Sequence, residues 1–334
     1  MFARLVPVGA LLLVLLLSSC GEPIRFGVAR TPITLGGAGE PAAIGDANGR
    51  TWEVGPGHPL KLPSEAARAA RDGDTVMIDP GEYDDCTVWR ANRVTIAASA
   101  PGVVFVGKTC QGKAIFVISG NNVTVRGITF THAAVSDHNG AGIRAEGSNL
   151  TVQDSRFIDN EEGILAGPNP HSTVRVIGSE FRGNGNCAAS CAHGIYVDAI
   201  ELLDVEGSHF TDTHEGHDIK SRALRTVLRG NDISDGPAGN SSYLVDVPNG
   251  GDLLMARNTL SKGPHTDNES TAISIGAEGV KNPTNSLVIR DNSFTSLLQK
   301  PTDFVHNLTQ ADAELIGNRL VGKVVPLQGP GTVR

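Results

Sequence analysis

One pattern of hydrophobic and polar positions recurs along most of the chain. Each copy has a short β-rich run, a small polar residue, one variable residue and a large apolar residue. Successive copies lie 23 to 34 residues apart and end at Phe130, Phe157, Phe181, Phe210, Ile233, Leu260, Phe294 and Leu320. The small polar residue is Ser155, Ser179 or Ser208 in the middle copies, then Asn231, Asn258, Asn292 or Asn318. This fixed position predicts a turn whose side chains form hydrogen bonds from one repeat to the next.

A second short apolar motif lies between copies of the first. It is clearest at 142–145, 163–166 and 194–197, where it begins Gly-Ile, and it continues less regularly at 218–221, 244–247 and 272–275. Each repeat therefore contains at least two short strands. Such a period indicates a solenoid or a propeller, but propeller blades need roughly 40 residues or more. The variable intervals favour a solenoid, in which stacked coils bury one continuous core.

Composition agrees with this β-rich interpretation. The 334 residues are 40% hydrophobic and only 4% aromatic, with 40 glycines and 18 prolines. Glycine does not recur at every third position, which excludes collagen, and enough aliphatic residues remain to bury a core. The net charge of −8 and the absence of basic blocks make the chain a poor binder of nucleic acid.

The first 19 residues predict a secretory signal peptide. A single charge, Arg4, precedes the apolar stretch 5–17, which is too short to span a bilayer. The stretch runs into Leu-Ser-Ser-Cys20-Gly, which resembles the lipobox of bacterial lipoproteins. The resemblance implies that Cys20 is lipidated and becomes the mature N-terminus. The alternative is an ordinary secretory signal that contains a cysteine.

The segment after the lipobox predicts a tether and a location. Residues 20–50 are rich in Gly, Ala and Pro and are expected to link the lipid to the folded domain. Glu22 stands where the resemblance associates Asp with inner-membrane retention, which favours the outer membrane. The lipid would be the protein's contact with the membrane.

Four cysteines remain after Cys20, and an even number in an exported chain predicts two disulfides. Cys86 and Cys110 are 24 residues apart, close to the repeat length, so they suit a bridge between neighbouring coils. Cys187 and Cys191 would close a small loop. The alternative is a metal site formed by these last two cysteines with His193.

The opening of the repeat region completes a resemblance. A helical stretch, 64–71, for which Ser64 is a plausible N-cap, is followed by Gly73-Asp74, Val76, Ile78, Pro80-Gly81 and Tyr83. With the repeats, this resembles the right-handed parallel β-helix of the pectate-lyase-like superfamily. The resemblance implies an all-β, single-stranded solenoid of about ten coils over 51–325, with a short N-terminal capping helix. Residues 326–334 are expected to form a loose tail, and the protein is expected to be a monomer.

Alternation along the strands predicts where polar side chains gather. If the second residue of each Gly-Ile-type motif points inward, the third forms an outward column of Arg144, Leu165, Tyr196, Lys220, Asp246 and Ser274. Two residues further lies a second column of Glu146, Gly167, Asp198, Arg222, Pro248 and Gly276. A slip of one residue at Asp246 would reverse its facing.

The densest group of chemically active residues lies at 214–223, with His193 and Tyr196 on the preceding rung and Asn249 on the next. The candidate catalytic residues are Lys220, Arg222, His217, Tyr196 and His193, and the candidate substrate-binding residues are Arg144, Asp198, Asp246 and Asn249. The alternative is that these residues have no functional role and belong to an exposed strand of alternating charges. No metal site is predicted, because His214 and His217 lie in strand context rather than in a helical zinc motif.

The superfamily resemblance implies an acidic, uronate-containing polysaccharide that is cleaved by β-elimination. Arg222 suits the substrate carboxylate, since a guanidinium binds carboxylate in a bidentate manner. Lys220 or His217 would remove the C5 proton, and Tyr196 or His193 would protonate the leaving oxygen.

Other activities remain open. C5 epimerisation would use the same groups, and a glycoside hydrolase would need two carboxylates, for which Asp198, Asp218 and Asp246 are candidates. A non-catalytic glycan-binding or envelope scaffold lipoprotein is the alternative outside enzymology. The calcium-dependent pectate-lyase pattern has no convincing match, so no cofactor is predicted, with calcium as the alternative.

Overall fold

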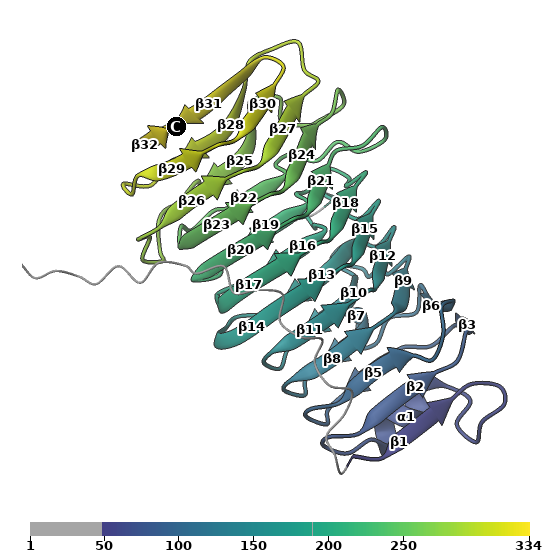
Figure 1. Ribbon diagram of the computed structural model, residues 1–334. Helices are drawn as coiled ribbons and strands as arrows, with labels where there is room; N and C mark the ends of the chain where they lie inside the picture. Colours follow the sequence, from purple (N-terminus) through teal and green to yellow (C-terminus); the bar gives the residue numbers. More distant parts are fainter. Residues whose placement is uncertain (1–48, 189) are drawn as a thin grey trace, which may run out of the picture. The chain divides into compact units, whose positions relative to one another are not determined.

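The computed structural model describes residues 49–334, apart from residue 189. The chain coils through three parallel sheets, A, B and C, visiting each once per turn (Figure 1). Sheets B and C hold ten strands each, so the described residues form ten coils, as predicted. The predicted signal peptide, Cys20 and nearly all of the tether lie outside the described residues.

The elements have the following bounds. Sheet A contains β1 (Thr51–Val54), β2 (Thr75–Ile78), β5 (Thr95–Ala98), β8 (Val123–Arg126), β11 (Leu150–Gln153), β14 (Asn169–Ile177), β17 (Ile200–Glu206), β20 (Arg225–Arg229), β23 (Asp252–Ala256), β26 (Leu287–Arg290), β29 (Ala313–Ile316) and β32 (Gly331–Val333). Sheet B contains β3 (Gly81–Tyr83), β6 (Val103–Val106), β9 (Ile128–Thr131), β12 (Arg156–Ile158), β15 (Glu180–Arg182), β18 (His209–Thr211), β21 (Asp232–Ser234), β24 (Thr259–Lys262), β27 (Ser293–Ser296) and β30 (Arg319–Val321). Sheet C contains β4 (Thr87–Trp89), β7 (Ala114–Ile118), β10 (Ala141–Ala145), β13 (Glu162–Ala166), β16 (Ile195–Val197), β19 (Ile219–Ser221), β22 (Val245–Val247), β25 (Thr271–Ile275), β28 (Thr302–Asn307) and β31 (Val324–Gln328).

The apolar anchors of the first motif form the core side of sheet B. Phe157 pairs in register with Phe130 and Phe181, and Phe181 pairs with Phe210. The rings of Phe157 and Phe181 are parallel with centroids 4.7 Å apart, and those of Phe181 and Phe210 are 4.6 Å apart. All four side chains are fully buried. The one large apolar residue per repeat therefore becomes a continuous ladder along the stack.

The small polar positions form a second ladder, as the sequence predicts. The hydroxyl of Ser179 accepts the backbone N–H of Ser155 at 3.2 Å. In the later coils the carboxamide of Asn258 accepts the backbone N–H of Asn231 at 2.9 Å and donates to the carbonyl of Leu228 at 3.0 Å. These buried side chains satisfy backbone groups at a corner where no strand partner is present.

Two of the glycines that begin the second motif, Gly142 and Gly163, lie against the phenylalanine ladder, which leaves no room for a side chain. A Cβ at Gly142 would lie 2.7 Å from Cδ1 of Phe157, and one at Gly163 would lie 2.8 Å from Cδ1 of Phe181. Both positions thus face the core, and the isoleucine that follows each glycine is also buried.

The N-terminal coil is covered by α1 (Pro63–Ala69). The helix begins one residue before the predicted start, with Pro at its first position, where a missing N–H costs nothing. Ser64 is therefore not the N-cap. Instead, the Glu65 carboxylate accepts the backbone N–H groups of Lys61 at 2.7 Å and Leu62 at 3.0 Å.

The C-terminal residues differ from the predicted tail. Residues 326–334 contribute to β31, which pairs with β28, and to β32, which pairs with β29. Proline and glycine led to the tail prediction. Pro326, however, lies in the last strand of sheet C, where an edge strand tolerates a missing ladder donor.

Both predicted disulfides are present. Cys86 and Cys110 are bridged with their Cα atoms 5.4 Å apart, and Cys187 and Cys191 with theirs 4.0 Å apart. The alternative metal site at Cys187, Cys191 and His193 was therefore wrong. Disulfides are typical of proteins that fold in an oxidising compartment. Among the residues that the structure describes, no helix has the length and apolarity needed to cross a membrane.

Candidate functional site

The predicted outward column on sheet C is correct. Tyr196 on β16 pairs with Lys220 on β19, and Lys220 pairs with Asp246 on β22. Asp246 pairs in turn with Ser274 on β25. These strands lie in the teal-to-green middle of the stack (Figure 1). Register alone thus places an aromatic hydroxyl, an ammonium and a carboxylate on three successive rungs.

Arg222 is held by three partners in three directions. Its Nε donates to the hydroxyl of Tyr196 at 3.1 Å, and its Nη1 donates to Oδ1 of Asn249 at 2.6 Å. Its Nη2 lies 2.7 Å from Oε2 of Glu278. The guanidinium fork is therefore fixed before any ligand binds, which lowers the entropy lost on binding.

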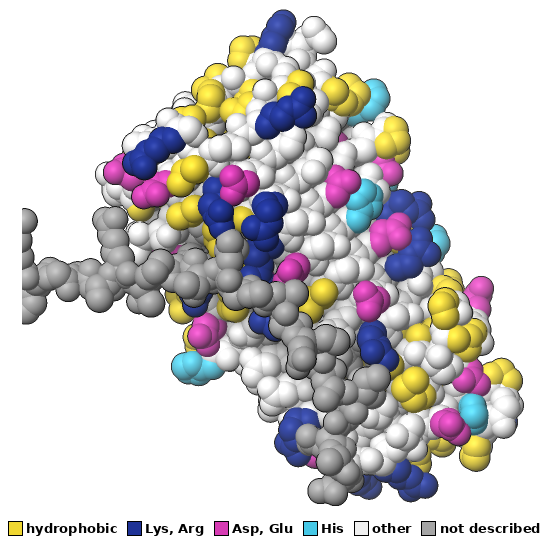
Figure 2. All heavy atoms as spheres, in the orientation of Figure 1, with side chains coloured by type: hydrophobic (Ala, Val, Ile, Leu, Met, Phe, Trp, Pro, Cys, Tyr) yellow, Lys and Arg dark blue, Asp and Glu magenta, His cyan; other side chains and the backbone are white. Residues whose placement is uncertain are grey.

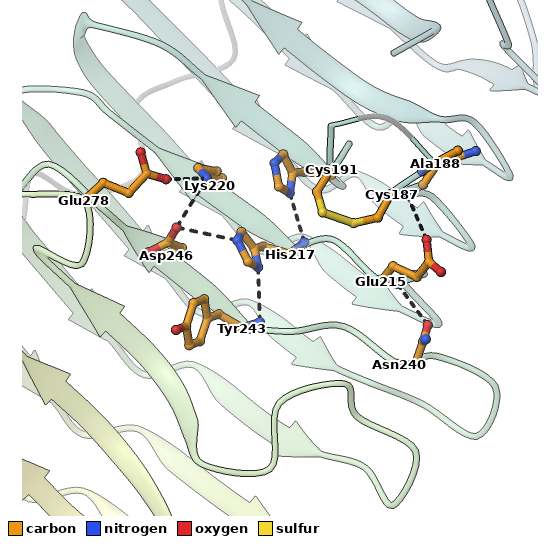
Figure 3. Close-up of a disulfide and its surroundings, with 12 residues drawn as sticks. Cys187, Ala188, Cys191, Glu215, His217, Lys220, Asn240, Tyr243, Asp246 and Glu278 are labelled. Carbon is orange, nitrogen blue, oxygen red and sulfur yellow. Dashed lines mark hydrogen bonds and ion pairs between the residues drawn. A yellow bond between two sulfur atoms is a disulfide. The ribbon is translucent and has the colours of Figure 1, made fainter. Parts of the chain in front are cut away.

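Lys220 lies beside Arg222 and shares its acidic partner. The Nζ of Lys220 is 2.8 Å from Oε1 of Glu278 and 3.7 Å from Oδ2 of Asp246 (Figure 3). The two oxygens of Glu278 thus contact two different cations. Burial acts to raise the pKa of Glu278, but the hydrogen bonds from Lys220 and Arg222 lower it overall. Glu278 is ionised at neutral pH.

The loop that presents Glu278 is fixed to the preceding rung. The backbone N–H of Glu278 donates to the carbonyl of Pro248 at 2.9 Å, and Nδ2 of Asn249 donates to the carbonyl of Gly279 at 3.1 Å. Asn282 donates from Nδ2 to the carbonyl of Arg222 at 3.1 Å. The insertion between β25 and β26 is therefore part of the site.

His193 and His217 form a buried pair behind these charges. Nδ1 of His193 accepts the backbone N–H of His217 at 3.0 Å, and Nδ1 of His217 accepts that of Tyr243 at 3.2 Å. A neutral imidazole that accepts at Nδ1 carries its proton on Nε2. Burial, then the charges of Lys220 and Lys262, lower the pKa of His217 to about 3. Burial and then His217 hold the pKa of His193 well below its usual range.

Asp246 connects the histidine pair to Lys220. Its Oδ2 lies 3.6 Å from Nε2 of His217, while its buried Oδ1 has no hydrogen-bond partner (Figure 3). Burial raises the pKa of Asp246 to about 6, against the lowering effect of Lys220. Asp246 thus changes charge near neutral pH, next to the ammonium of Lys220.

A disulfide loop positions His193. The Cys187–Cys191 bridge closes the segment just before it, and the backbone N–H of Cys187 donates to Oε2 of Glu215 at 2.8 Å (Figure 3). Oδ1 of Asn240 accepts the backbone N–H of Glu215 at 2.9 Å. Three successive coils are therefore linked at the rim of the histidine pair.

A second buried network holds the start of β19. Asp218, next to Ile219, accepts from the Thr213 hydroxyl at 2.6 Å and from the Ser241 hydroxyl at 3.3 Å. Burial, then Asp235, raise the pKa of Asp218 to about 8. The fully buried Lys262 donates to the carbonyl of Ser242 at 2.7 Å, one residue before Tyr243. Asp218 is therefore a structural residue below the surface, not a surface carboxylate for hydrolysis.

An open groove of about 460 Å³ lies over the cluster. It is lined by Tyr196, Asp198, Ala199, Arg222, Asn249, Glu278, Lys281 and Asn282. Burial raises the pKa of Tyr196, against the lowering effect of Arg222, so its hydroxyl keeps its proton at neutral pH. The groove thus presents a proton donor, a fixed guanidinium and a carboxylate to solvent.

The structure brings most of the predicted residues together. His193, Tyr196, His217, Lys220, Arg222, Asp246 and Asn249 belong to one connected group, and Asp198 lines its groove. Arg144 lies two rungs from Tyr196, across Leu165. It contributes to the field at buried Glu162, whose pKa is raised well above its usual value, mainly by burial.

Sequence reasoning missed Glu278, Glu162 and Tyr243. Glu278 follows the end of β25 by three residues and lies in an insertion, where alternation along a strand no longer predicts which side chains face outward. Glu162 begins β13, on the rung before His193, where burial does not alternate because all five residues of the strand are buried. Within the described part of the chain, no group of three or more His, Cys, Asp or Glu side chains is arranged to hold a metal ion.

On the face of the stack shown in Figure 2, acidic and basic side chains are interspersed among uncharged ones. A charged residue on a coil surface is therefore ordinary in this molecule. The cluster around Lys220 differs because its charges are largely withdrawn from solvent. The side chains of Lys220, Asp246 and His217 are 13%, 3% and 11% exposed.

The fold defines the class: a right-handed parallel β-helix. Residues 84–194 match the family model described as "Right handed beta helix region". An alginate lyase from Paenibacillus sp. str. FPU-7 is similar in structure, with a TM-score of 0.62 and 15% identity over 80% of this chain and 95% of that one. Pectate lyase Pel9A has a TM-score of 0.50 and 13% identity over 83% and 78% of the two chains. A search of curated proteins finds no match.

Proposed function

We propose that the protein is an exported polysaccharide lyase that cleaves an acidic, uronate-containing glycan by β-elimination at the groove over β16, β19 and β22. The observation that carries the proposal is the convergence of Tyr196, Lys220 and Arg222. Arg222 contacts the Tyr196 hydroxyl directly, and one carboxylate joins Arg222 to Lys220. Two solved β-helix structures that resemble this chain are an alginate lyase and a pectate lyase, which supports the choice of substrate class.

Arg222 supplies the first requirement of the reaction. A uronate carboxylate held by its guanidinium would have its charge neutralised, which acidifies the C5 proton. Arg222 is the better electrostatic partner because its fork is already fixed by Tyr196 and Asn249. Asp198 and Asn249 would bind sugar hydroxyls along the groove, and Arg144 would contact the glycan further along the stack.

Lys220 in its neutral form is the proposed base and Tyr196 the proposed acid. The Lys220 nitrogen takes the C5 proton, and the electron pair of the C5–H bond forms the C4=C5 double bond. The C4–O bond then breaks, and the leaving oxygen takes the proton of the Tyr196 hydroxyl. Arg222 Nε, 3.1 Å from that hydroxyl oxygen, would stabilise the phenolate that remains. No metal ion or cofactor takes part in this scheme.

His217 and His193 have positioning roles in this proposal rather than the acid–base roles considered from the sequence. His217 has its proton on Nε2 and is neutral, so it is a donor toward Asp246 and has no free basic nitrogen. His193 is 3% exposed and accepts at Nδ1. His193 supports the backbone of His217, and His217 lies next to Asp246, which contacts Lys220.

One observation favours a second candidate, a glycan-binding protein without catalysis. The ammonium of Lys220 contacts two carboxyl groups, Glu278 and Asp246, and an amine held as an ammonium has no lone pair with which to take the C5 proton. C5 epimerisation would use the same three residues without breaking the C4–O bond.

The proposal also covers location and assembly. The two disulfides support export. Lipidation at Cys20 would anchor the protein to the cell envelope, at the outer membrane, with the acidic glycan as its partner and the β-helix acting as a monomer.

The test is ultraviolet absorbance of the unsaturated uronate product. The soluble chain from Gly21 onward is incubated with a panel of acidic polysaccharides, alongside Lys220→Ala, Arg222→Ala and the exposed control Lys300→Ala. We expect the wild type and Lys300→Ala to give product and the two site variants to give none. Absorbance that survives both site substitutions would place catalysis elsewhere. Binding without product in the wild type would favour the non-catalytic candidate or the epimerase.

A further inference from the structure

Glu278 occupies the position that the proposed function gives to the substrate. Its Oε1 is 2.8 Å from Lys220 Nζ and its Oε2 is 2.7 Å from Arg222 Nη2. A carboxylate between an ammonium and a guanidinium is the arrangement that a uronate would adopt on these same two cations. We propose that Glu278 is an internal competitor, so that a ligand enters this site only by replacing the Glu278 carboxylate with its own.

The charge balance supports exchange rather than simple addition. With Glu278 in place and ionised, the two cations face two carboxyl groups, those of Glu278 and Asp246, and present little net positive charge. A second carboxylate brought to the same point would face Glu278 at close range, and like charges in contact repel. Displacing Glu278 exposes both cations to the entering carboxylate.

The geometry permits this exchange without unfolding the loop. The backbone around Glu278 stays hydrogen-bonded to Pro248 and Asn249, while the Glu278 side chain itself is 43% exposed. Rotation about its own side-chain bonds carries the carboxylate into solvent. Asn249 and Tyr196 continue to hold Arg222, and Asp246 continues to contact Lys220. The site left behind is therefore preformed.

The exchange makes Glu278 a specificity-determining residue. A neutral sugar has no carboxylate that could replace Glu278. Lys220 and Arg222 therefore stay paired with Glu278 and form no ion pair with that ligand. A carboxylate sugar binds with an apparent affinity equal to its intrinsic affinity multiplied by the fraction of time for which Glu278 is displaced. This inference takes its ligand class from the proposed function but requires only binding, not cleavage.

The experiment measures binding by isothermal titration calorimetry with trimannuronate, trigalacturonate and neutral mannotriose. It compares the wild-type chain with Glu278→Gln and Glu278→Ala. The matched control is Glu269→Gln, which removes one exposed acidic charge in the loop before β25, where Glu269 pairs with Lys300. Thermal denaturation of each variant checks that the fold is retained.

We expect both Glu278 variants to bind at least one acidic trimer more tightly than the wild type does, by a factor of about ten or more. This is the effect of removing a competitor from the site. Mannotriose should be unaffected, and Glu269→Gln should bind the acidic trimers like the wild type. Equal or weaker binding of the acidic trimers by the Glu278 variants would overturn the inference, as would an equal gain in Glu269→Gln, which would reflect net charge alone.

The two proposals fail in different ways. If the wild type cleaves an acidic glycan and Glu278→Gln binds no more tightly, the lyase stands and the competitor role is wrong. If the variants bind tighter and no glycan is cleaved, the competitor role stands and the lyase is wrong. Absence of binding to every acidic trimer by all variants overturns the competitor role, and the lyase is overturned as well when the polysaccharide panel gives no product.

Discussion

The imidazole rings of His193 and His217 lie nearly parallel with centroids 4.8 Å apart, and Nδ1 of His193 accepts the backbone N–H of His217. The contact repeats one rung later, where Nδ1 of His217 accepts the N–H of Tyr243. Each ring thus satisfies the backbone of the following coil. Because Nδ1 is occupied in both rings, Nε2 carries the proton, and the only polar group of His217 directed at the surface charges is a donor.

Acidification should destabilise the fold through His217. Its pKa is about 3 in the folded chain and near 6.5 when unfolded, so between these values the unfolded state binds a proton that the folded state does not. The stability from neutral His217 is complete above pH 6.5 and is lost as the pH falls, by at most about 1.4 kcal/mol per pH unit. In His217→Asn, the side-chain oxygen can still accept the Tyr243 N–H. Because asparagine does not titrate, the loss of stability on acidification should be smaller in this variant.

Guanidinium denaturation of the wild type and His217→Asn at pH 7.5, 5.5 and 4.5 measures this effect. We expect the difference in unfolding free energy between the two proteins to narrow as the pH falls. Parallel stability curves over this range would contradict the assignment of a neutral, buried His217.

The contribution of Asp246 to the unfolding free energy should change with pH in the opposite direction to that of His217. Its pKa is raised from 3.8 to about 6 in the folded chain, so its contribution to stability is present below pH 3.8 and lost as the pH rises through 6. Asp246→Asn removes a buried charge and should raise the unfolding free energy at pH 8 by about 1–3 kcal/mol, with little change at pH 4. If the proposed function holds, the same variant should lose at least about tenfold in kcat, since Lys220 loses its orienting partner.

Denaturation midpoints at pH 8 and pH 4, combined with product formation, separate these effects. A variant that is less stable at pH 8 would mean that the pair with Lys220 outweighs the burial cost. A variant that is more stable and fully active would remove Asp246 from the proposed chemistry.

The repeats made the fold predictable because a solenoid converts sequence period directly into position. Phe157 and Phe181 are 24 residues apart in the sequence and pair with each other in sheet B. Aligning the repeats in the sequence therefore already predicts which residues of neighbouring strands pair. The same logic placed Tyr196, Lys220 and Asp246 side by side. Alternation along each strand then predicted the face of sheet C that these three side chains share.

Positions outside the strands were not predictable in this way. Glu278 lies in an insertion, and nothing in the repeat fixes where an insertion folds. Its place depends on Asn249 and Asn282, whose side chains donate to backbone carbonyls of other coils. The acid–base roles of the histidines also required structure, because burial and the occupant of Nδ1 decide them. The tail prediction at 326–334 was wrong because the exposed edges of β28 and β29 pair with this segment despite its weak strand propensity.

Arg222 should not tolerate replacement by lysine. Its fork reaches Tyr196, Asn249 and Glu278 at once, and an ammonium on a flexible stem cannot hold all three directions. Arg222→Lys should lower kcat/KM by about 100-fold, a loss of about 2.7 kcal/mol in transition-state stabilisation. Because the Arg222 side chain is only 18% exposed and has three partners, thermal denaturation of the variant is needed to separate a loss of folded protein from a loss of activity.

The comparison variant for Arg222→Lys is Tyr196→Phe, which keeps the ring and removes the proposed proton donor. In steady-state kinetics we expect Tyr196→Phe to lower kcat with KM retained, whereas Arg222→Lys lowers kcat and raises KM. Full activity in Arg222→Lys would show that a positive charge alone suffices and that the fixed geometry has no role.

The asparagine ladder should be the most sensitive feature outside the hydrophobic core. Removing the Asn258 side chain leaves the N–H of Asn231 and the carbonyl of Leu228 without partners in a buried corner. Each unsatisfied buried group costs about 1–3 kcal/mol, so the two groups together should lower the unfolding free energy of Asn258→Ala by about 2–6 kcal/mol. Asn258→Ser should cost less, because Ser179 and Ser208 accept the same backbone N–H at equivalent corners. Guanidinium denaturation of the three proteins tests this order, and equal losses for Ala and Ser would mean that the ladder stabilises the stack through packing rather than through its hydrogen bonds.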